Sequence, residues 1–373
     1  MQFENNRDMV TVPEQGRRRH GMGVSLILPL KSVRAYILKG DRMSTISTIY
    51  DVSRLSGVST ATVSRAFSNP DQVRESTRRK VYEAAEMLHY SPNAIARAMA
   101  LQRTDKIAYL ICKKGATILD EFYAGICDGI MRTANRSDFQ LLVSTEEDWP
   151  LTVSTAQSKQ IEGVILGGNA QPSLVSELQD QHVAVVLVNN RIAGFDLPCV
   201  VADEASGVRQ AVELLIGRGH RRIAMLAGRV TPYVIGERYR AFLECMKEHG
   251  LQVGPADVKM CDANVDGATE AATELLSRPD RPTAVFCAND VVAAGTFKAA
   301  RRLGLHLPED LAVVGFDDSS VCSMLEPELT SVNINTRRMG ELCVERLTAL
   351  LEGEKQVPRL TVVPTELIIR RSV

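Results

Sequence analysis

A long uninterrupted apolar run is missing from this chain of 373 residues. The apolar stretch at 24–30 is broken by Pro29 and falls well short of the roughly 20 residues that a membrane-spanning helix needs. A basic triplet precedes it at 17–19, but no small-residue cleavage site follows and Lys31 closes the run, so the pattern is not that of a secretory signal. The sequence therefore predicts no membrane span and a location in the cytoplasm.

Paired cysteines are also missing. The 8 cysteines are scattered singly, without a C-x-x-C pair or companion histidines at metal-ligand spacing. We expect reduced thiols in the core, as in a cytosolic protein, and no metal site. The cysteines are Cys112, Cys127, Cys199, Cys245, Cys261, Cys287, Cys322 and Cys343.

Catalytic motifs are absent too. The sequence has no G-x-G-x-x-G after its first expected strand, no G-x-x-x-x-G-K-[ST], no G-x-S-x-G and no H-E-x-x-H, and its 6 histidines are dispersed. We therefore predict no catalytic residues and no cofactor, which disfavours an enzyme as the alternative class.

What the chain does have is a balanced composition with an uneven distribution of charge. It is 45% hydrophobic and 24% charged, which is enough to bury at least two cores. Residues 1–103 carry 16 Lys and Arg against 9 Asp and Glu, whereas residues 104–373 carry 28 against 36. A small basic head on an acidic body is the polarity of a polyanion-binding module joined to a second domain.

Four segments follow from the patterning. Residues 1–43 show no sustained period and form an expected tail, either disordered as a flexible basic arm or the product of translation upstream of Met43. Residues 44–90 are expected to form a helical domain, 91–105 a short helix and linker, and 106–373 a two-lobed domain. The short helix begins near Pro92 and is too short to be stable without a partner.

Three helical patterns, at 49–55, 60–67 and 76–88, make up the helical domain. Gly57 can take the left-handed conformation that ends the first helix, Val58 can pack beneath the turn, and Ser59 can cap the second helix. This junction predicts a helix-turn-helix, with any small helical bundle as the alternative. The outer face of the second helix would carry Thr60, Ala61, Ser64 and Arg65.

Apolar strands alternate with amphipathic helices from Lys106 onward. Near-continuous apolar strands predict parallel sheets with helices on both faces, and about 270 residues of this pattern exceed one six-stranded unit. We expect an α/β fold of two lobes with a cleft between them. The expected strands are 107–111, 139–143, 163–166, 183–188, 222–227, 284–287 and 312–316.

These motifs together resemble the LacI/GalR family of bacterial transcriptional regulators. The most specific segment is 49–65, IYDVSRLSGVSTATVSR, in which Ser53 and Ser56 replace two usual alanines. The resemblance extends over about 46–371 through EGVIL at 162–166, GHRRIA at 219–224, AND at 288–290, VGFDD at 314–318 and PTEL at 364–367.

The resemblance implies a dimer that binds double-stranded operator DNA, with recognition helices in the major groove and paired hinge helices in the minor groove. Met99 stands where the family usually has the leucine that wedges the minor groove. Thr60 and Ala61 match base-discriminating positions, and Arg65 matches an arginine that contacts a base or a phosphate. Ser59 is expected mainly as a helix cap that can also meet a phosphate. The DNA-binding residues implied are Ser59, Thr60, Ala61, Ser64, Arg65, Asn93, Arg97 and Met99.

For the body, the resemblance implies a fold like that of periplasmic sugar-binding proteins, closing on a small-molecule effector. The matching cleft residues are Phe122, Tyr123, Asn189, Arg238, Asn289 and Asp317. Arginine with aspartate suits vicinal hydroxyls, although an inter-strand salt bridge is the alternative for that pair. Asp290 is expected to cap the following helix rather than touch the ligand.

Two departures bear on the ligand. The stretch 261–264 lacks the aromatic residue on which a pyranose can stack, and Asp120–Glu121 replaces the usual Asn-Pro. A sugar or sugar derivative is expected, with its class open. No C-terminal heptad helix follows the last expected strand, which predicts a homodimer. We expect a repressor, with activation less common in the family and a transport-type binding protein as the alternative function.

Overall fold

The computed structural model describes residues 47–68, 70–90, 104–115, 120–145, 149–157, 160–228 and 232–373. The chain separates into two compact units, with the division between Pro92 and Asn93. The expected tail at 1–43 and the expected hinge residues Asn93, Arg97 and Met99 lie outside the described residues.

The first unit is the small helical domain that the sequence predicts. Its elements are α2 (Ile49–Ser56), α3 (Thr60–Ser68), the 3-10 turn η1 (Pro70–Gln72) and α4 (Glu75–Met87). Val52, Val63, Val81 and three alanines form its buried core. Each helix contributes to this core, so the three short helices stabilise one another by packing rather than by intrinsic propensity.

The turn between α2 and α3 has the predicted geometry. Gly57 is in the left-handed region, with φ of 71°, and Val58 packs against the core. Ser59 Oγ accepts a hydrogen bond from Thr62 N at 3.2 Å, as an N-cap does. Ser53 Oγ donates to Val58 O at 2.6 Å, so the serine that replaces the usual alanine ties the turn to α2.

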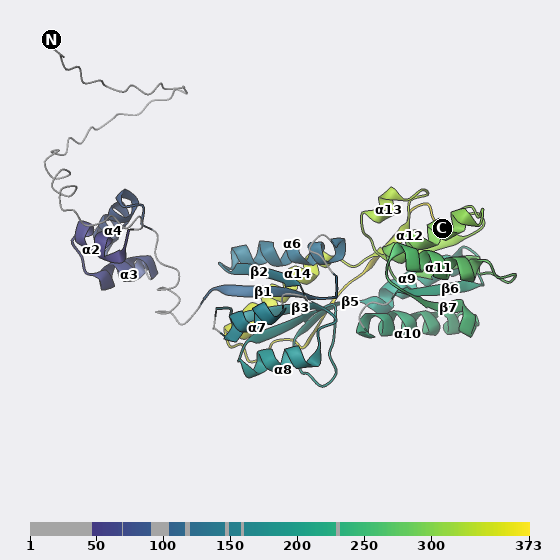
Figure 1. The fold of residues 1–373 in the computed structure, drawn as a ribbon, viewed down its shortest axis with the longest axis horizontal. Helices are drawn as coiled ribbons and strands as arrows, with labels where there is room; N and C mark the ends of the chain where they lie inside the picture. The colour runs from purple at the N-terminus through teal and green to yellow at the C-terminus, as the bar shows by residue number, and fades with distance from the viewer. Residues whose placement is uncertain are drawn as a thin grey trace, which may run out of the picture. The chain divides into compact units, whose positions relative to one another are not determined.

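The second unit contains two α/β lobes, each built on a six-stranded sheet (Figure 1). The first sheet has the order β11-β5-β4-β3-β1-β2 and the second the order β12-β10-β9-β8-β6-β7. The first lobe comprises β1 (Lys106–Cys112), α6 (Glu121–Arg136), β2 (Gln140–Thr145), α7 (Trp149–Gln157), β3 (Gly163–Gly168), α8 (Pro172–Asp180), β4 (Ala184–Val188), β5 (Cys199–Ala202), α14 (Thr336–Leu351) and β11 (Leu360–Val363).

The second lobe holds the intervening part of the chain. It comprises α9 (Glu204–Gly217), β6 (Ile223–Gly228), α10 (Pro232–Glu248), η3 (Pro255–Asp257), β7 (Val258–Cys261), α11 (Val265–Leu276), β8 (Ala284–Cys287), α12 (Asp290–Arg302), β9 (Ala312–Asp317), α13 (Val321–Met324), β10 (Thr330–Asn333) and β12 (Glu366–Ile368). The chain passes between the lobes after β5, after β10 and after β11, so three connecting segments join them (Figure 1).

All seven predicted strands are present, within two residues of their expected ends. The prediction of parallel pairing is confirmed except at β12, which runs antiparallel to β10. The interpretation of 139–143 as a buried strand is wrong in part, because β2 lies at a sheet edge and leaves Leu142 and Val143 each 37% exposed. Five strands of three or four residues, β5, β7, β10, β11 and β12, were not predicted.

Helices α6 and α14 approach each other closely through glycines. A Cβ on Gly129 would lie 2.0 Å from Arg337 O, and one on Gly340 would lie 2.1 Å from Ile126 O. Only glycine fits at both positions, because backbone atoms occupy the space where a side chain would begin. The contact holds the middle of α6 against the first turns of α14.

All eight cysteines are free thiols, seven of them buried and Cys127 half-buried, as predicted. Among the described residues, no helix combines the length and the apolar character needed to cross a membrane.

Candidate functional site

A cavity of about 930 Å³ opens where the carboxyl ends of strands from both sheets meet. This edge is where open parallel sheets bind ligands. All six residues predicted from the sequence for the cleft line this one cavity: Phe122, Tyr123, Asn189, Arg238, Asn289 and Asp317. Its charged lining residues are Lys113, Lys114, Asp120, Glu121, Arg238, Asp290, Asp317 and Asp318.

Arg238, from α10, lies at the centre of a buried ionic cluster with Glu204 and Asp317. Its Nε donates to Glu204 Oε2 at 2.6 Å and its Nη2 donates to Asp317 Oδ1 at 3.3 Å. Its Nη1 donates to the carbonyl oxygen of Ala288. The guanidinium also stacks on Phe316, with Cζ 3.7 Å from the ring centroid. The salt bridge that the sequence left as an alternative is thus present, within the cavity wall.

Two carboxylates share this single guanidinium, and burial raises the pKa of both. Burial raises the pKa of Asp317 to about 7 against the lowering influence of Arg238, with Asp290 and Glu204 as further negative neighbours. Burial also raises the pKa of Glu204, although its hydrogen bond with Arg238 favours the charged form. The cluster therefore adds no net positive charge to the cavity.

Asn189 and Asn289 supply amide groups from the two lobes. Asn189 follows β4, and its Oδ1 is buried without a hydrogen-bond partner among the described residues. An unpaired buried acceptor is costly, so it marks a position where a ligand donor would be favourable. Asn289 Oδ1 accepts from Val292 N at 2.9 Å, which leaves its amide nitrogen as the group available to a ligand.

The expectation that Asp290 caps the following helix is wrong, because Asn289 is the cap of α12. Asp290 is fully buried and accepts hydrogen bonds from Ser331 Oγ at 2.5 Å and from Ser319 N at 2.7 Å. It therefore holds the loop that follows β9, which begins directly after Asp317. The helix begins so that Asn289, one residue before the expected Asp290, stands at the cap position.

The wall from the first lobe is built at the start of α6. Phe122 and Tyr123 pack edge to face, with ring centroids 5.0 Å apart. Glu121 reaches the other lobe: its Oε1 accepts from Ser320 N at 2.7 Å and its Oε2 accepts from Ser320 Oγ at 2.6 Å. The residue that replaces the family's usual proline therefore joins the two lobes beside the cavity.

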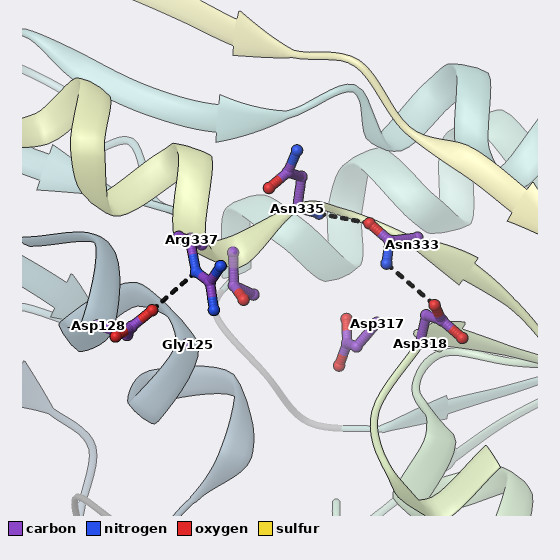
Figure 2. Close-up of a pocket in the computed structure, with 8 residues that line it drawn as sticks. Gly125, Asp128, Asp317, Asp318, Asn333, Asn335 and Arg337 are labelled. Atoms are coloured by element: carbon purple, nitrogen blue, oxygen red, sulfur yellow. Dashed lines mark hydrogen bonds and ion pairs between the residues drawn. The ribbon is translucent and has the colours of Figure 1, made fainter. Parts of the chain in front are cut away.

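A second cavity, of about 390 Å³, adjoins the first near the crossover between β10 and α14 (Figure 2). Asp317 and Asp318 line both cavities. Asn333 bridges here, donating to Asp318 Oδ2 and accepting from Asn335 N, each at 2.9 Å, as the dashed lines in Figure 2 show. No group of His, Cys, Asp and Glu within the described residues could hold a metal ion.

In the first unit, α3 presents the predicted outer face. Ala61, Ser64 and Arg65 are exposed and Thr60 is half-buried, whereas Val63 and Ala66 are buried. The N-terminal turns of such a helix are the part that contacts base edges in a helix-turn-helix complex.

Sequence reasoning missed Glu204 and the bridge from Glu121 to Ser320. The signal for Glu204 was a carboxylate that opens a helix directly after the apolar segment CVVA, but that strand has only four residues. No local pattern connects Glu121 with Ser320, because 199 positions separate them.

A helix-turn-helix unit followed by two lobes with a polar cleft has the construction of a ligand-responsive DNA-binding regulator. Comparison with known families agrees with this class. Residues 48–93 match the bacterial regulatory proteins of the lacI family, and residues 212–373 match a periplasmic binding protein-like domain.

Full-length relatives support the same assignment. Catabolite control protein A of Priestia megaterium is 32% identical over 331 residues, which are 87% of this chain and 98% of the relative. The HTH-type transcriptional repressor CytR of Escherichia coli strain K12 is 30% identical over 340 residues, 90% of this chain and 98% of that protein. The second of these relatives is by name a transcriptional repressor.

Solved structures extend the similarity to the fold. A transcriptional regulator CelR–cellobiose complex superposes with a TM-score of 0.68 at 31% identity, covering 88% of this chain and 100% of that one. The lac repressor dimer bound to operator and the anti-inducer ONPF gives a TM-score of 0.76 at 25% identity, covering 88% of this chain and 99% of that one. The chain belongs to the lacI family of bacterial regulatory proteins and is a DNA-binding transcriptional regulator.

Proposed function

We propose that the chain represses transcription as a cytoplasmic homodimer whose affinity for operator DNA is set by a small molecule bound in the larger cavity. The observation that carries this proposal is the convergence of six residues from both lobes on one cavity of about 930 Å³, beside which Glu121 is hydrogen-bonded to Ser320 of the other lobe. The relatives whose structures contain cellobiose or ONPF support the same assignment. We propose neither a catalytic step nor a cofactor.

Ligand control would act through lobe closure. Phe122, Tyr123 and Asn189 belong to the first lobe, whereas Arg238, Asn289 and Asp317 belong to the second. A ligand that contacts both sets binds the closed arrangement better than an open one, and only such a difference in affinity can shift the equilibrium. The three crossovers would absorb the change in lobe angle, as hinge segments do.

At the DNA, α3 would enter the major groove. Arg65 offers the fork that pairs with guanine or phosphate, and Ala61 permits apolar contact with a thymine methyl. Ser59, Thr60 and Ser64 would contribute hydroxyl contacts at the same surface. Asn93, Arg97 and Met99 remain proposed hinge contacts with the minor groove.

Two measurements on the full chain test this function. Selection from a pool of random-sequence duplexes should recover a two-fold symmetric site, because a homodimer presents two recognition helices. A thermal-shift screen with sugars, sugar acids, sugar phosphates, nucleosides and purines should then give a stabilising compound, since a ligand at 100 times its dissociation constant adds about 2.7 kcal/mol.

The cleft residues can be separated from the DNA surface by substitution. Asp317→Ala should retain the selected site and lose the ligand response. A response that survives in this variant would move the effector site away from the cavity, and failure to enrich any duplex would contradict the assignment of α3.

A further inference from the structure

Glu204 lies behind the wall of the larger cavity and acts on it through Arg238. The three cationic side chains that line the cavity are the exposed Lys113 and Lys114 and the buried Arg238. Arg238 is therefore the one cation in the described lining that could meet a ligand away from solvent. The charge and the hydrogen bonds of Arg238 therefore decide whether the interior of the cavity can bind an anionic ligand.

Protein acceptors already occupy most of this guanidinium. Nε is bound by Glu204, Nη1 by the carbonyl oxygen of Ala288 and Nη2 by Asp317, while Phe316 covers one face. An arginine has five N–H donors, so one donor remains on each terminal nitrogen. The side-on pair of parallel bonds, with which arginine holds a carboxylate or phosphate through Nε and a terminal nitrogen, is closed to a ligand here because Glu204 occupies Nε.

The charge of the guanidinium is also neutralised. The Arg238 and Glu204 side chains are each 2% exposed, so solvent screens their interaction little. Five carboxylates line the same cavity against three cations. An anionic ligand in the interior would have to be desolvated beside this acidic wall, where the one buried cation is already paired with protein carboxylates. Hydroxyl groups, in contrast, can both accept from the remaining donors and donate to the carboxylates.

We infer that Glu204 is a positioning residue that sets the charge selectivity of the cleft, so that it takes an uncharged, hydroxyl-rich ligand and rejects phosphorylated or carboxylated ones. This inference rests on the proposed function, because it concerns the same cavity. Glu204 would act by fixing and neutralising Arg238 rather than by touching the ligand, since it is not among the residues that line the cavity.

The test uses inorganic phosphate as a charge probe on the full chain. Calorimetric titration at constant ionic strength should show that Glu204→Gln binds phosphate at least about tenfold more tightly than the unmodified chain, because removing a charge a few ångströms from Arg238 changes the local field strongly. Glu248→Gln is the matched control, since it removes the same charge from the exposed pair with Arg209. This control should bind phosphate as the unmodified chain does.

Equal phosphate affinity in the two variants, or tight binding by the unmodified chain, would overturn the inference. A purely structural role would lower the melting temperature of Glu204→Gln without changing its phosphate affinity. If that variant does not fold, thermal shifts of the unmodified chain decide the question, with each sugar or nucleoside tested beside its phosphate ester.

We expect that only the uncharged compound of a pair raises the melting temperature of the chain, and that its phosphate ester does not. An ester that stabilises more than its uncharged parent would contradict the selectivity while leaving the proposed function intact. If no compound of any pair stabilises the chain, the result contradicts both the proposed function and the preference for hydroxyl-rich ligands. The phosphate affinities of the two variants measure the charge effect of Glu204 separately.

Discussion

Two arginines show how the two units of this regulator use the same side chain differently. Arg65 is exposed on the outer face of α3, where DNA is proposed to bind. Arg238 is 2% exposed, with protein acceptors at all three of its nitrogens. A surface that binds a polyanion needs accessible cations, whereas a cleft for a small ligand needs a fixed geometry and a controlled charge.

This difference predicts opposite consequences for folding and binding. Arg65 makes little contribution to the core of its unit, so its loss should lower mainly the affinity for DNA. Arg238 is part of the packing of the second lobe, so its loss should lower mainly the free energy of unfolding.

The largest effect is expected for Arg238→Ala, which should lower the free energy of unfolding by about 3–5 kcal/mol, because it leaves Glu204 buried without its cation. Urea denaturation of the full chain measures this. Arg209→Ala is the matched control, because the pair of Arg209 and Glu248 is exposed and such pairs contribute about 0–1 kcal/mol. Similar losses in the two variants would remove the distinction between buried and exposed arginines.

A pH dependence of up to a few kcal/mol should follow from Asp317. Its pKa is raised to about 7 in the folded chain, above the unfolded value near 3.9, so the folded state holds the extra proton between these values. Stability should therefore be greatest below about pH 4 as far as this group is concerned, and should fall as pH rises to about 7.

The size of this effect is bounded by about 1.4 kcal/mol for each unit of pKa shift. Asp317→Asn should flatten this part of the profile while preserving a hydrogen-bond acceptor for Arg238. Denaturation curves at several pH values between 4 and 8 compare the two chains. An unchanged slope in the variant would assign the dependence to other groups.

An intermediate effect is expected for Arg65→Ala, which should weaken binding to the selected duplex by about 1–3 kcal/mol. Its unfolding free energy should change little, because Arg65 is exposed. Fluorescence anisotropy measures the affinity, and Arg79→Ala on α4 is the control for loss of one exposed charge. If both variants bind the duplex equally well, Arg65 makes no specific contact.

The sequence was most informative where local patterns determine local structure. The turn at Gly57 and Ser59 and seven of the strands were predicted because they follow periodicity and capping over a few residues. The six cleft residues came from family resemblance, and the cavity brings all six together.

What could not be predicted depends on long-range packing. Glu204 and Arg238 are 34 positions apart, and Glu121 and Ser320 are 199 apart, so their contacts follow from the assembly of two lobes. Among the strands that were not predicted, β5 and β10–β12 have three or four residues each and flank the connections between the lobes. The cap of α12 is Asn289 and not the predicted Asp290, so the sequence placed this helix start one residue too late.

The smallest effect concerns the cap of α3. Ser59→Ala should destabilise the first unit by about 1 kcal/mol, because Thr62 N loses its side-chain acceptor. Asn289→Ala removes the equivalent bond to Val292 N at α12 and should cost a similar amount in the second unit. Hydrogen exchange measured separately in the two units tests this, since each loss should be confined to its own unit.

Because Asn289 also lines the cavity, its variant should lose ligand response as well, whereas Ser59→Ala should leave that response unchanged and weaken DNA binding. A loss of ligand response in Ser59→Ala would show that the cap of α3 is coupled to the cleft.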